Sequence, residues 1–399
     1  MAVQVVTPRI RGFICTSAHP VGCQKNVDDG IKHIKGSTPF KGTNPNVLVI
    51  GASTGYGLAS RIALTWGYGA KSIGVFYERP AAGRRTATAG YYNAVAFHQR
   101  AQEDGFFAAS LNGDAFSDEL KREAVARVKR ELGQIDLLVY SIAAPRRTHP
   151  RTGVEHQSEL KPIGAPYTGK TIDLNREVIT EVTVDPATEE EIADTVAVMG
   201  GEDLQMWSDA LLDEGVFAPE SRVVAYNYIG HELTWAMYRD GTIGRAKEDL
   251  VRHITDLDAR LADEVGGHAY LSVNKAVITQ ASAAIPVLPL YVSILYHIMN
   301  AKGINEEPIG QMARLFGEHL GSDMSPTLDP DDYIRLDDRE LRPDVATEVT
   351  NRWAEVNTDN FQDLSDYAGF KRGFRNLFGF EVDGVDYDAA VETELVLPE

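Results

Sequence analysis

Tyr238 and Lys247 are the residues whose types and spacing most directly suggest chemistry. Eight residues separate them, and Gly241 and Gly244 are among the eight. A tyrosine hydroxyl can donate or relay a proton, and a nearby ammonium lowers the pKa of the tyrosine and favours that role. Such a pair suits hydride transfer to an electrophilic carbon, because the tyrosine can stabilise charge that develops on a neighbouring oxygen. The chain therefore carries a candidate reductase pair.

The separation of the pair is a difficulty on a single helix. At about 100° per residue, the two side chains would lie on opposite faces of an unbroken helix. The two glycines remove the objection, because they allow Tyr238 to lie on a turn before the helix that carries Lys247. Taken alone, Lys247 could equally be a solvated helix residue, and Tyr238 and Tyr228 could be core aromatics. The pair gains meaning only if the chain also supplies a cofactor site.

Strands and helices alternate over the N-terminal part of the chain. Short, almost wholly apolar runs predict strands at residues 47–50, 72–77, 106–111 and 135–140. Helix-compatible segments lie between them at residues 58–66, 93–104 and 118–132. Apolar strands that alternate with helices are typical of a parallel sheet covered on both faces. We therefore expect the α/β class, with a doubly wound, Rossmann-type parallel sheet.

The rest of the chain departs from this alternation and then returns to it. Residues 146–220 predict short extended pieces, such as 178–184, and an acidic helix at 188–199, so we interpret them as an insertion packed on the same domain. Strands are expected again at 222–228 and 269–273, with a long amphipathic helix from 243 to 261 between them. Beyond residue 300 we expect mostly acidic helices and a small strand pair near 378–387. One domain over residues 1–399 is the expected organisation.

A glycine-rich turn follows the first predicted strand and opens the next helix. Gly51, Gly55 and Gly57 are spaced as G-x-x-x-G-x-G. Glycines allow the backbone to turn tightly and to approach a pyrophosphate, whose charge then faces the N-terminal amides of the helix. A purely structural turn uses the same residues, but the position between a strand and a helix favours a dinucleotide site.

The end of the second strand favours one dinucleotide over the other. Glu78, with Tyr77 before it, lies where an acidic residue meets the adenosine ribose hydroxyls. A carboxylate at this place would repel a 2′-phosphate, so NADH is expected over NADPH. Arg79, Arg84 and Arg85 are close enough in sequence to weaken this argument.

The third and fourth strands end in further candidates. Asp114 and Ala115 follow the third strand and can contact the adenine. Ile142 and Ala143 follow the fourth strand, where small residues allow a ribose and a nicotinamide to lie close. Each could be an ordinary turn between a strand and a helix. Their shared position at the carboxyl ends of strands, where open α/β sheets bind ligands, favours the dinucleotide interpretation.

A charge-free stretch from residue 276 to 300 has more than one interpretation. It holds no Asp, Glu, Lys or Arg, as a membrane span would, but it includes Gln280, Pro286, Pro289 and His297, which a span tolerates poorly. We interpret it as the wall of a substrate pocket, in a segment at about 274–300, followed by a core helix. A plain core helix would have the same composition.

Composition limits the class of protein. The 399 residues carry a formal net charge of −19, which disfavours nonspecific binding to nucleic acids or anionic membranes. Two cysteines, Cys15 and Cys23, cannot build a disulfide framework, and no CxxC spacing suggests a metal site. The N-terminus has no apolar core of signal-peptide length. We therefore expect a reducing, cytoplasmic setting without a metal or a nucleic-acid partner.

The motifs together resemble a known family. The chain is similar to the FabV-type enoyl-ACP reductases and the closely related trans-2-enoyl-CoA reductases in the segments GASTGYGLASR, YERP, NGDAFSDE, SIAAPRR and VITQASAAIP, and in the spacing of Tyr238 and Lys247. The resemblance runs through nearly the whole chain. The interval of eight residues differs from the shorter intervals of ordinary short-chain dehydrogenases and of other enoyl reductases. The best-known members have Phe where this chain has Tyr77, a conservative difference.

The resemblance implies a role for each matching residue. Tyr238 is implied as the proton donor, Tyr228 as the contact to the thioester carbonyl, and Lys247 as the lysine that holds the cofactor. Thr279 is implied at the start of the substrate-pocket segment. The implied NAD contacts are Gly51, Ala52, Ser53, Thr54, Gly55, Tyr56, Tyr77, Glu78, Asp114, Ala115, Ile142, Ala143, Lys247, Ala276, Val277 and Ile278.

The reaction that the resemblance implies is the NADH-dependent reduction of the C2=C3 double bond of trans-2-enoyl thioesters in fatty acid synthesis. Hydride would reach C3, Tyr228 and Tyr238 would hold the enolate oxygen, and C2 would receive a proton with Tyr238 as its source. The carrier is CoA or acyl carrier protein, and both are negatively charged. A local basic patch is therefore expected on this acidic chain, with Arg146, Arg147 and Arg151 as candidates. A monomer is also implied.

Two other interpretations stay open. A short-chain-type NAD(P)H carbonyl reductase would share the glycine-rich turn but not the spacing of Tyr238 and Lys247, and it would oxidise alcohols rather than reduce crotonyl-CoA. A non-enzymatic NAD-sensing module would need no polar side chains at the nicotinamide end, where this chain also has Tyr228.

Overall fold

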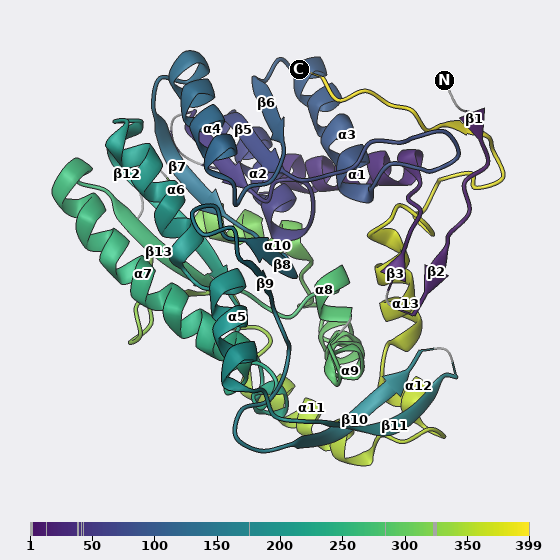
Figure 1. Ribbon diagram of the computed structural model, residues 1–399. Helices are drawn as coiled ribbons and strands as arrows, with labels where there is room; N and C mark the ends of the chain where they lie inside the picture. Colours follow the sequence, from purple (N-terminus) through teal and green to yellow (C-terminus); the bar gives the residue numbers. More distant parts are fainter. Residues whose placement is uncertain are drawn as a thin grey trace.

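A parallel sheet forms the centre of the molecule (Figure 1). Its seven strands lie in the order β14-β13-β12-β7-β4-β5-β6, and each neighbouring pair is parallel. The strands are β4 (Asn46–Ile50), β5 (Lys71–Phe76), β6 (Ala108–Asn112), β7 (Ile135–Tyr140), β12 (Phe217–Asn227), β13 (His268–Val273) and β14 (Tyr333–Arg335). The computed structural model describes residues 3–12, 14–37, 40, 42, 44–174, 176–283, 285–321 and 325–398. Asn175, inside the predicted insertion, and Ala284, inside the predicted pocket segment, lie outside these ranges.

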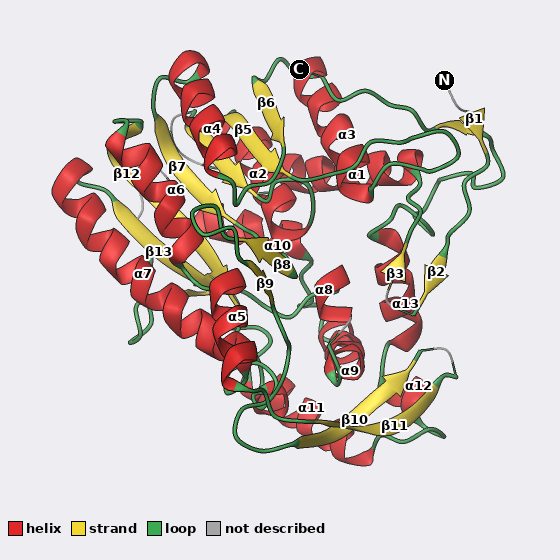
Figure 2. Ribbon diagram, in the orientation of Figure 1, coloured by secondary structure: helices red, strands yellow, loops and turns green. Residues whose placement is uncertain are grey.

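Helices cover both faces of the sheet (Figure 2). In β4, Val47 and Val49 join one apolar cluster, whereas Leu48 and Ile50 join another. Successive side chains of a strand point to opposite faces, so both faces of this strand are buried. The first cluster includes residues of α1 (Pro20–Gly36), α2 (Gly55–Tyr68), α3 (Ala89–Glu103) and α10 (Pro308–Arg314), and the second includes residues of α4 (Asp118–Glu131), α6 (Glu202–Asp213) and α7 (Thr242–Val265). The expected doubly wound, Rossmann-type sheet is confirmed.

Helix α7 has the amphipathic pattern that the sequence predicts. Its buried apolar residues recur at intervals of three and four: they are Ile243, Ala246, Leu250, Ile254, Leu257 and Leu261. The last four join the apolar cluster on one face of the sheet, whereas Ile243 joins the cluster around α9 (Leu288–Ala301). The helix ends at Gly266, whose φ of 69° lies in the left-handed region that favours glycine. Lys247 lies in the second turn of α7, so this helix fixes the position of one candidate catalytic residue.

Residues 146–213 form two hairpins and two helices beside the sheet. The predicted insertion ends before residue 220, because β12 already begins at Phe217 and pairs with β7 there. The antiparallel pairs are β8 (Arg146–Thr148) with β9 (Glu155–Gln157) and β10 (Tyr167–Asp173) with β11 (Val178–Val184). Helix α5 (Glu189–Met199) begins with a capping box, in which Thr188 and Glu191 each bond the backbone N–H of the other. Helix α5 packs on α7, and β10 packs on α9 (Leu288–Ala301). The predicted strand at 178–184 and the predicted acidic helix are both confirmed.

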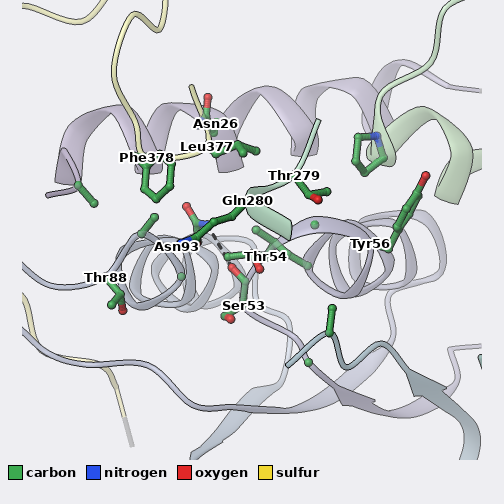
Figure 3. A pocket seen from close by; sticks show the side chains of 18 of the residues that line it. Asn26, Ser53, Thr54, Tyr56, Thr88, Asn93, Thr279, Gln280, Leu377 and Phe378 are labelled. Atoms are coloured by element: carbon green, nitrogen blue, oxygen red, sulfur yellow. Dashed lines mark hydrogen bonds between the residues drawn. The ribbon is translucent and has the colours of Figure 1, made fainter. Parts of the chain in front are cut away.

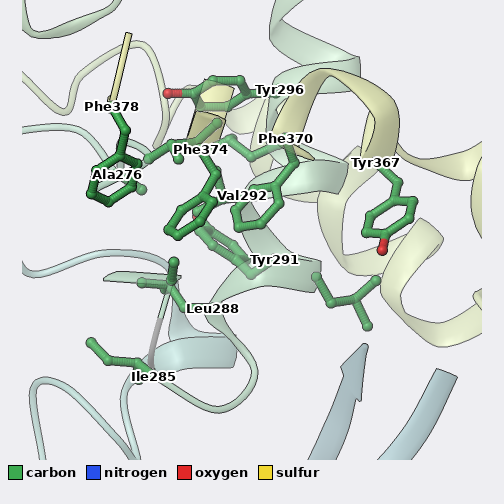
Figure 4. Packing of buried hydrophobic residues seen from close by; sticks show 14 of the residues in the cluster. Ala276, Ile285, Leu288, Tyr291, Val292, Tyr296, Tyr367, Phe370, Phe374 and Phe378 are labelled. Atoms are coloured by element: carbon green, nitrogen blue, oxygen red, sulfur yellow. The ribbon is translucent and has the colours of Figure 1, made fainter. Parts of the chain in front are cut away.

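A third apolar cluster surrounds α9, which carries the charge-free stretch. Figure 4 shows Leu288, Tyr291 and Val292 beside Phe370 and Phe374, and all five are buried. The neighbouring helices are α8 (Gln280–Ala283), α11 (Pro343–Glu355), α12 (Phe361–Leu364) and α13 (Tyr367–Asn376). The part of this stretch that forms α9 is therefore mostly buried inside the molecule. Among the described residues, no helix combines the length and the apolar character that a membrane crossing requires.

The strand pair expected at residues 378–387 is absent from this described segment. The chain there forms turns, and the Tyr387 hydroxyl accepts a hydrogen bond from the Val382 amide at 2.7 Å and donates one to the Gly379 carbonyl at 3.0 Å. Phe378, Phe380 and Val382 are buried without being part of a strand, so the prediction of a strand pair is wrong here. The short strands of this side of the molecule are β1 (Val3–Gln4) with β15 (Val391–Glu392) and β2 (Ile10–Arg11) with β3 (Ile14–Cys15).

Candidate active site

A cavity of about 1250 Å³ lies at the carboxyl ends of β4, β5, β6 and β7. Ordinary small-molecule pockets measure roughly 300–1,000 Å³, so this cavity has room for a dinucleotide. Figure 3 shows the side chains of Ser53, Thr54 and Tyr56 at its wall. The predicted contacts that line it are Gly51, Ser53, Thr54, Gly55, Tyr56, Tyr77, Glu78, Asp114, Ala115, Ile142, Ala143 and Ile278.

The glycine-rich turn has the geometry of a pyrophosphate site. Gly51 has a φ of 88°, and a Cβ there would overlap the Ser141 carbonyl oxygen, so no other residue fits between β4 and β7. Gly55 has a φ of 53° and faces open space, with no atom within 4 Å of a Cβ placed there. Thr54 is the N-cap of α2 but makes no side-chain capping bond. The first amides of α2 therefore stay available to an anion beside the cavity.

Glu78 is held rigidly at the cavity wall. Its Oε1 accepts a hydrogen bond from the Ser53 hydroxyl at 2.7 Å, and its backbone exchanges two hydrogen bonds with the Asn112 side chain, at 2.8 and 2.9 Å. Gly90, in the first turn of α3, leaves room for the carboxylate, because a Cβ there would overlap Glu78 Oε1. Asn93 in turn holds the Ser53 carbonyl at 3.1 Å, the dashed contact in Figure 3. These contacts fit a carboxylate that receives ribose hydroxyls.

Tyr238 lies on a turn before α7, as the two glycines predict. The turn follows a short 3-10 helix, η1 (Glu232–Thr234), and the Tyr238 amide donates to the Thr234 carbonyl at 3.0 Å. Gly244 permits a close approach here, because a Cβ would overlap the Arg239 carbonyl oxygen. Gly241 has a φ of −98°, so its backbone does not adopt the left-handed conformation that favours glycine.

Tyr228 and Tyr238 meet at the end of β12. Their ring centroids lie 4.9 Å apart, and the rings are nearly perpendicular. The Tyr238 hydroxyl makes no hydrogen bond with a described residue, so it is free to meet a ligand. Burial, with a smaller contribution from the Glu340 charge, raises the pKa of Tyr238 above its usual value. The expectation that a nearby ammonium lowers this pKa is therefore wrong, and Tyr238 stays protonated at neutral pH.

Lys247 points back to the same strand end. Its Nζ donates a hydrogen bond to the Tyr226 carbonyl oxygen at 3.1 Å, which leaves two donors for other partners. Burial lowers the pKa of Lys247 to about 8, because a charged amine loses hydration inside the protein. Within the described structure Lys247 has no hydrogen bond to Tyr228 or Tyr238.

The predicted site residues divide into two groups. Most predicted cofactor contacts line the cavity, as does Thr279. The described residues that line this cavity do not include Ala52, Tyr228, Tyr238, Lys247, Ala276 or Val277. The segment that follows β13 connects the two groups. Tyr56, on the cavity wall, donates a hydrogen bond to the Lys275 carbonyl oxygen of this segment at 2.8 Å.

Sequence reasoning missed a buried polar cluster next to Tyr228. Glu340 and Tyr291 are fully buried, and Lys275 is 1% exposed. The Glu340 carboxylate accepts hydrogen bonds from the hydroxyls of Tyr228 and Tyr291, at 3.1 and 2.6 Å. No motif marks Glu340, which lies in an acidic and mostly helical region. Only its burial and its partners distinguish it from the other carboxylates of the chain.

The three arginines proposed for the carrier differ in their surroundings. Arg147 is 1% exposed, donates to the Ala197 carbonyl at 2.7 Å, and pairs with Glu202 at 2.8 Å. Arg147 therefore belongs to a buried, structural ion pair, and the prediction that it contributes to a basic patch for the carrier is wrong. Arg146 lines the cavity and pairs with Glu155 at 3.5 Å, both side chains being exposed. Arg151 is exposed.

Comparison with known proteins shows which family this chain is similar to. A family model described as the trans-2-enoyl-CoA reductase catalytic region matches residues 85–320, and one described as the NAD(P)H binding domain of trans-2-enoyl-CoA reductase matches residues 5–83. A protein of Opitutus terrae named enoyl-[acyl-carrier-protein] reductase [NADH] is 50% identical over 98% of this chain and 99% of its own length. A protein of Ruminiclostridium cellulolyticum named trans-2-enoyl-CoA reductase [NADH] is also 50% identical, over 98% of both chains.

Solved structures give the same result. Trans-2-enoyl-CoA reductase of Clostridium acetobutulicum, in complex with NADH, superposes with a TM-score of 0.95 at 43% identity and covers 99% of each chain. The enzyme of Treponema denticola, in complex with NAD, superposes with a TM-score of 0.92 at 42% identity, over 99% of this chain and 100% of the other. These matches exclude the short-chain carbonyl reductase alternative as the family of this protein.

A third family model, described as an enoyl reductase FAD binding domain, matches residues 328–391. This region contributes Asp366, Arg372 and Phe378 to the same cavity. Two glycines of this region line the cavity. Gly373 lies inside α13, and Gly369 lies in its first turn, where the Gly369 amide already donates to the Asp366 carboxylate at 2.9 Å. The negative charge of Asp366 at this helix N-terminus disfavours a pyrophosphate. The region therefore does not fit a second dinucleotide by itself. Taken together, the sheet, the site and these full-length matches show that the chain belongs to the family of trans-2-enoyl-CoA and NADH-dependent enoyl-[acyl-carrier-protein] reductases.

Proposed function

We propose that this protein catalyses the NADH-dependent reduction of the C2=C3 double bond of trans-2-enoyl thioesters to acyl thioesters, a step of fatty acid synthesis. The carrier is CoA or acyl carrier protein. The observation that carries the proposal is the free hydroxyl of Tyr238, set edge-on to Tyr228 at the carboxyl end of β12 in a chain of this family. A protonated tyrosine at this place suits an oxygen that gains charge during hydride transfer.

The glycine-rich turn and the neighbouring strand ends are the proposed NADH site. Gly55 and the α2 amides take the pyrophosphate, Glu78 takes the adenosine ribose, and Lys247 takes the nicotinamide ribose. The fixed position of Glu78 and the open space at Gly55 support this assignment. The full proposed set is Gly51, Ala52, Ser53, Thr54, Gly55, Tyr56, Tyr77, Glu78, Asp114, Ala115, Ile142, Ala143, Lys247, Ala276, Val277 and Ile278.

The proposed mechanism separates a hydride step from a proton step. NADH, when bound, supplies the hydride that C3 of the enoyl thioester receives. The hydroxyls of Tyr228 and Tyr238 stabilise the thioester oxygen as it gains negative charge. Tyr238 then supplies the proton to C2, directly or through a relay, and its raised pKa keeps that proton in place until the oxygen is charged. Thr279, on the cavity wall, lies at the start of the proposed acyl pocket.

The direct test measures NADH oxidation with enoyl-CoA substrates of increasing chain length. The proposal predicts turnover of crotonyl-CoA to butyryl-CoA, with chain length changing the rate. A protein that oxidises alcohols with NAD and leaves crotonyl-CoA unchanged would be a carbonyl reductase. A protein that binds NADH but turns over neither substrate would be a sensing module.

Glu78 is expected to set the preference for NADH. Replacing it by Gln removes the charge that would repel a 2′-phosphate while it keeps the size and the bond to Ser53. The ratio of kcat/KM for NADH to that for NADPH is expected to fall roughly tenfold or more, the effect of one charge pair in a partly buried site. Glu119→Gln, at an exposed position of α4, is the matched control. A wild-type preference for NADPH would contradict the assignment of Glu78.

Arg146 is the proposed contact for the phosphates of the carrier. Its position on the cavity wall supports this role, whereas Arg151 is exposed and absent from that wall. Arg146→Glu is expected to raise the KM for crotonyl-CoA roughly two- to fivefold, the usual worth of an exposed ion pair, without changing the KM for NADH. Arg151→Glu is expected to have the smaller effect. An unchanged KM in both variants would remove these arginines from the carrier site.

The proposed organisation is one Rossmann-type reductase domain over residues 1–399. It has an insertion at about 146–220 and a substrate-pocket segment at about 274–300, and the packing of β10 on α9 supports a close connection between the two. A monomer in the reducing cytoplasm is the proposed state. Cys15 and Cys23 are both free thiols, which is compatible with that setting.

A further inference from the structure

Glu340 lies at a junction of three structural elements. It follows β14, and its fully buried carboxylate receives hydrogen bonds from Tyr228 at the end of β12, from Tyr291 in α9, and from the Ala276 amide after β13. The distances are 3.1, 2.6 and 2.7 Å. Glu340 therefore connects the proposed thioester contact, Tyr228, with the segment that carries the proposed nicotinamide contacts.

The two oxygens of the carboxylate have different partners. Oε2 receives the Ala276 amide, which can only donate. Oε1 receives both tyrosine hydroxyls, which can donate or accept. A proton on Glu340 is therefore directed to Oε1, between Tyr228 and Tyr291. When Oε1 carries that proton, it can donate to the Tyr228 oxygen, and the hydrogen of the Tyr228 hydroxyl becomes free.

The charges around Glu340 oppose one another. Burial raises the pKa of Glu340, the positive charge of Lys275 acts in the opposite direction, and Asp337 adds a smaller increase. Lys275 donates to the Ala276 carbonyl at 2.6 Å, and its Nζ lies 4.4 Å from the centre of the Tyr296 ring. The hydroxyls of Tyr228 and Tyr291 also face the carboxylate, and the Glu340 charge raises the pKa of Tyr238 and of Tyr56. A buried carboxylate among such partners costs more free energy than an apolar side chain would, so packing alone does not require it.

We propose that Glu340 is a positioning residue for thioester reduction, and that its protonation decides whether Tyr228 donates its hydroxyl hydrogen to the thioester oxygen. The ionised carboxylate holds the Tyr228 hydrogen and leaves Tyr238 as the single donor to that oxygen. The protonated carboxyl releases the Tyr228 hydrogen, so that two hydroxyls stabilise the charge. This inference rests on the proposed function, and it adds to that function a control of kcat by pH.

The test follows kcat at saturating NADH and crotonyl-CoA from about pH 5 to about pH 7.5, a range in which shifted carboxyl groups titrate and which lies below the pH at which Lys247 loses its charge. Because a carboxyl with a raised pKa is protonated below that pKa and ionised above it, the kcat of the wild type is expected to fall as pH rises. The fall is expected to be on the order of tenfold to a hundredfold, the effect of losing one donor to an oxyanion.

Glu340→Gln tests the role of the proton. A glutamine that accepts from Ala276 with its oxygen directs one amide hydrogen at each tyrosine, so Tyr228 receives a donor, as it does from the single hydrogen of the protonated carboxyl. This variant is expected to keep the high kcat and to lose the fall with pH. Glu340→Gln with the same fall as the wild type would overturn the proposal, and so would a wild type whose kcat does not fall.

Two tyrosine variants test whether Glu340 acts through Tyr228, and they also test the proposal if Glu340→Gln fails to fold. Tyr228→Phe is expected to lose the fall with pH, because Glu340 then has no hydroxyl to release toward the substrate. Tyr291→Phe, the matched control, is expected to keep it. A fall that persists in Tyr228→Phe would overturn the proposal. Failure of the proposed function is distinct, because the wild type would then leave NADH and crotonyl-CoA unchanged at every pH.

Discussion

Replacing Tyr238 by Phe is expected to lower kcat by about 10²- to 10⁴-fold, the usual contribution of a positioned general acid. The variant removes one oxygen atom and keeps the ring that packs edge-on against Tyr228. That hydroxyl makes no hydrogen bond with a described residue, so its loss leaves no protein partner unsatisfied. The loss should therefore fall on the chemical step, while NADH affinity stays nearly unchanged.

Single-turnover reduction of crotonyl-CoA, measured with the dissociation constant of NADH, checks this expectation. Tyr226→Phe is the matched control, because the Tyr226 hydroxyl interacts with Ser60 at 2.6 Å and Tyr226 packs against the apolar cluster on one face of the sheet. The control should keep most of its kcat. Full activity in Tyr238→Phe would remove Tyr238 from the proton step.

Replacing Lys247 by Ala is expected to weaken NADH binding roughly 10- to 100-fold and to lower kcat as well. A hydrogen bond from a charged donor contributes about 1.5–3 kcal/mol, which corresponds to this range. The pKa of Lys247 is lowered to about 8 by burial, so the amine is charged at neutral pH and loses its charge as pH rises above about 8. The affinity of the wild type for NADH should therefore decrease through that pH, and the affinity of the variant should not.

Titration of NADH into each protein at several pH values measures both effects. Lys32→Ala, an exposed position on α1, is the control for general loss of positive charge.

The lowered pKa of Lys247 also affects the stability of the apo-protein, because the unfolded chain binds one more proton than the folded chain between about pH 8 and the normal lysine range. Lys247→Met should raise the free energy of unfolding at neutral pH, because it removes a charge that the folded chain buries.

An NADH affinity that does not change in Lys247→Ala would contradict the role of Lys247 in holding the cofactor.

The local pattern of the sequence was sufficient to predict most of the sheet and α7. Apolar runs and three-four spacings reflect burial directly, so β7 and α7 appear where the residues predict them. The turn at Tyr238 was also predicted, but for a different reason. Gly244 is required by a close approach to the Arg239 carbonyl, whereas the sequence suggested only conformational freedom. A close approach depends on tertiary packing, and the spacing of residues along the chain gives no information on that packing.

The electrostatics of the site could not be predicted from neighbours in sequence. Lys247 was expected to lower the pKa of Tyr238, yet burial and Glu340, about 100 residues further along the chain, raise it. Arg147 was expected at the surface, yet it is buried against Glu202. In both cases the decisive partner comes from a distant part of the chain. The cofactor turn was predictable because its strand, turn and helix are consecutive.

The most direct measurement of the central claim is the position of the transferred hydrogen. Crotonyl-CoA is incubated with the wild type and with NADH that carries deuterium on the transferred side of C4, and the product is analysed by mass spectrometry and NMR. The proposed mechanism predicts butyryl-CoA with deuterium at C3 and a solvent-derived hydrogen at C2. Deuterium at C2, or NADH that stays unoxidised while crotonyl-CoA stays unchanged, would contradict the assignment of this protein as an enoyl-thioester reductase.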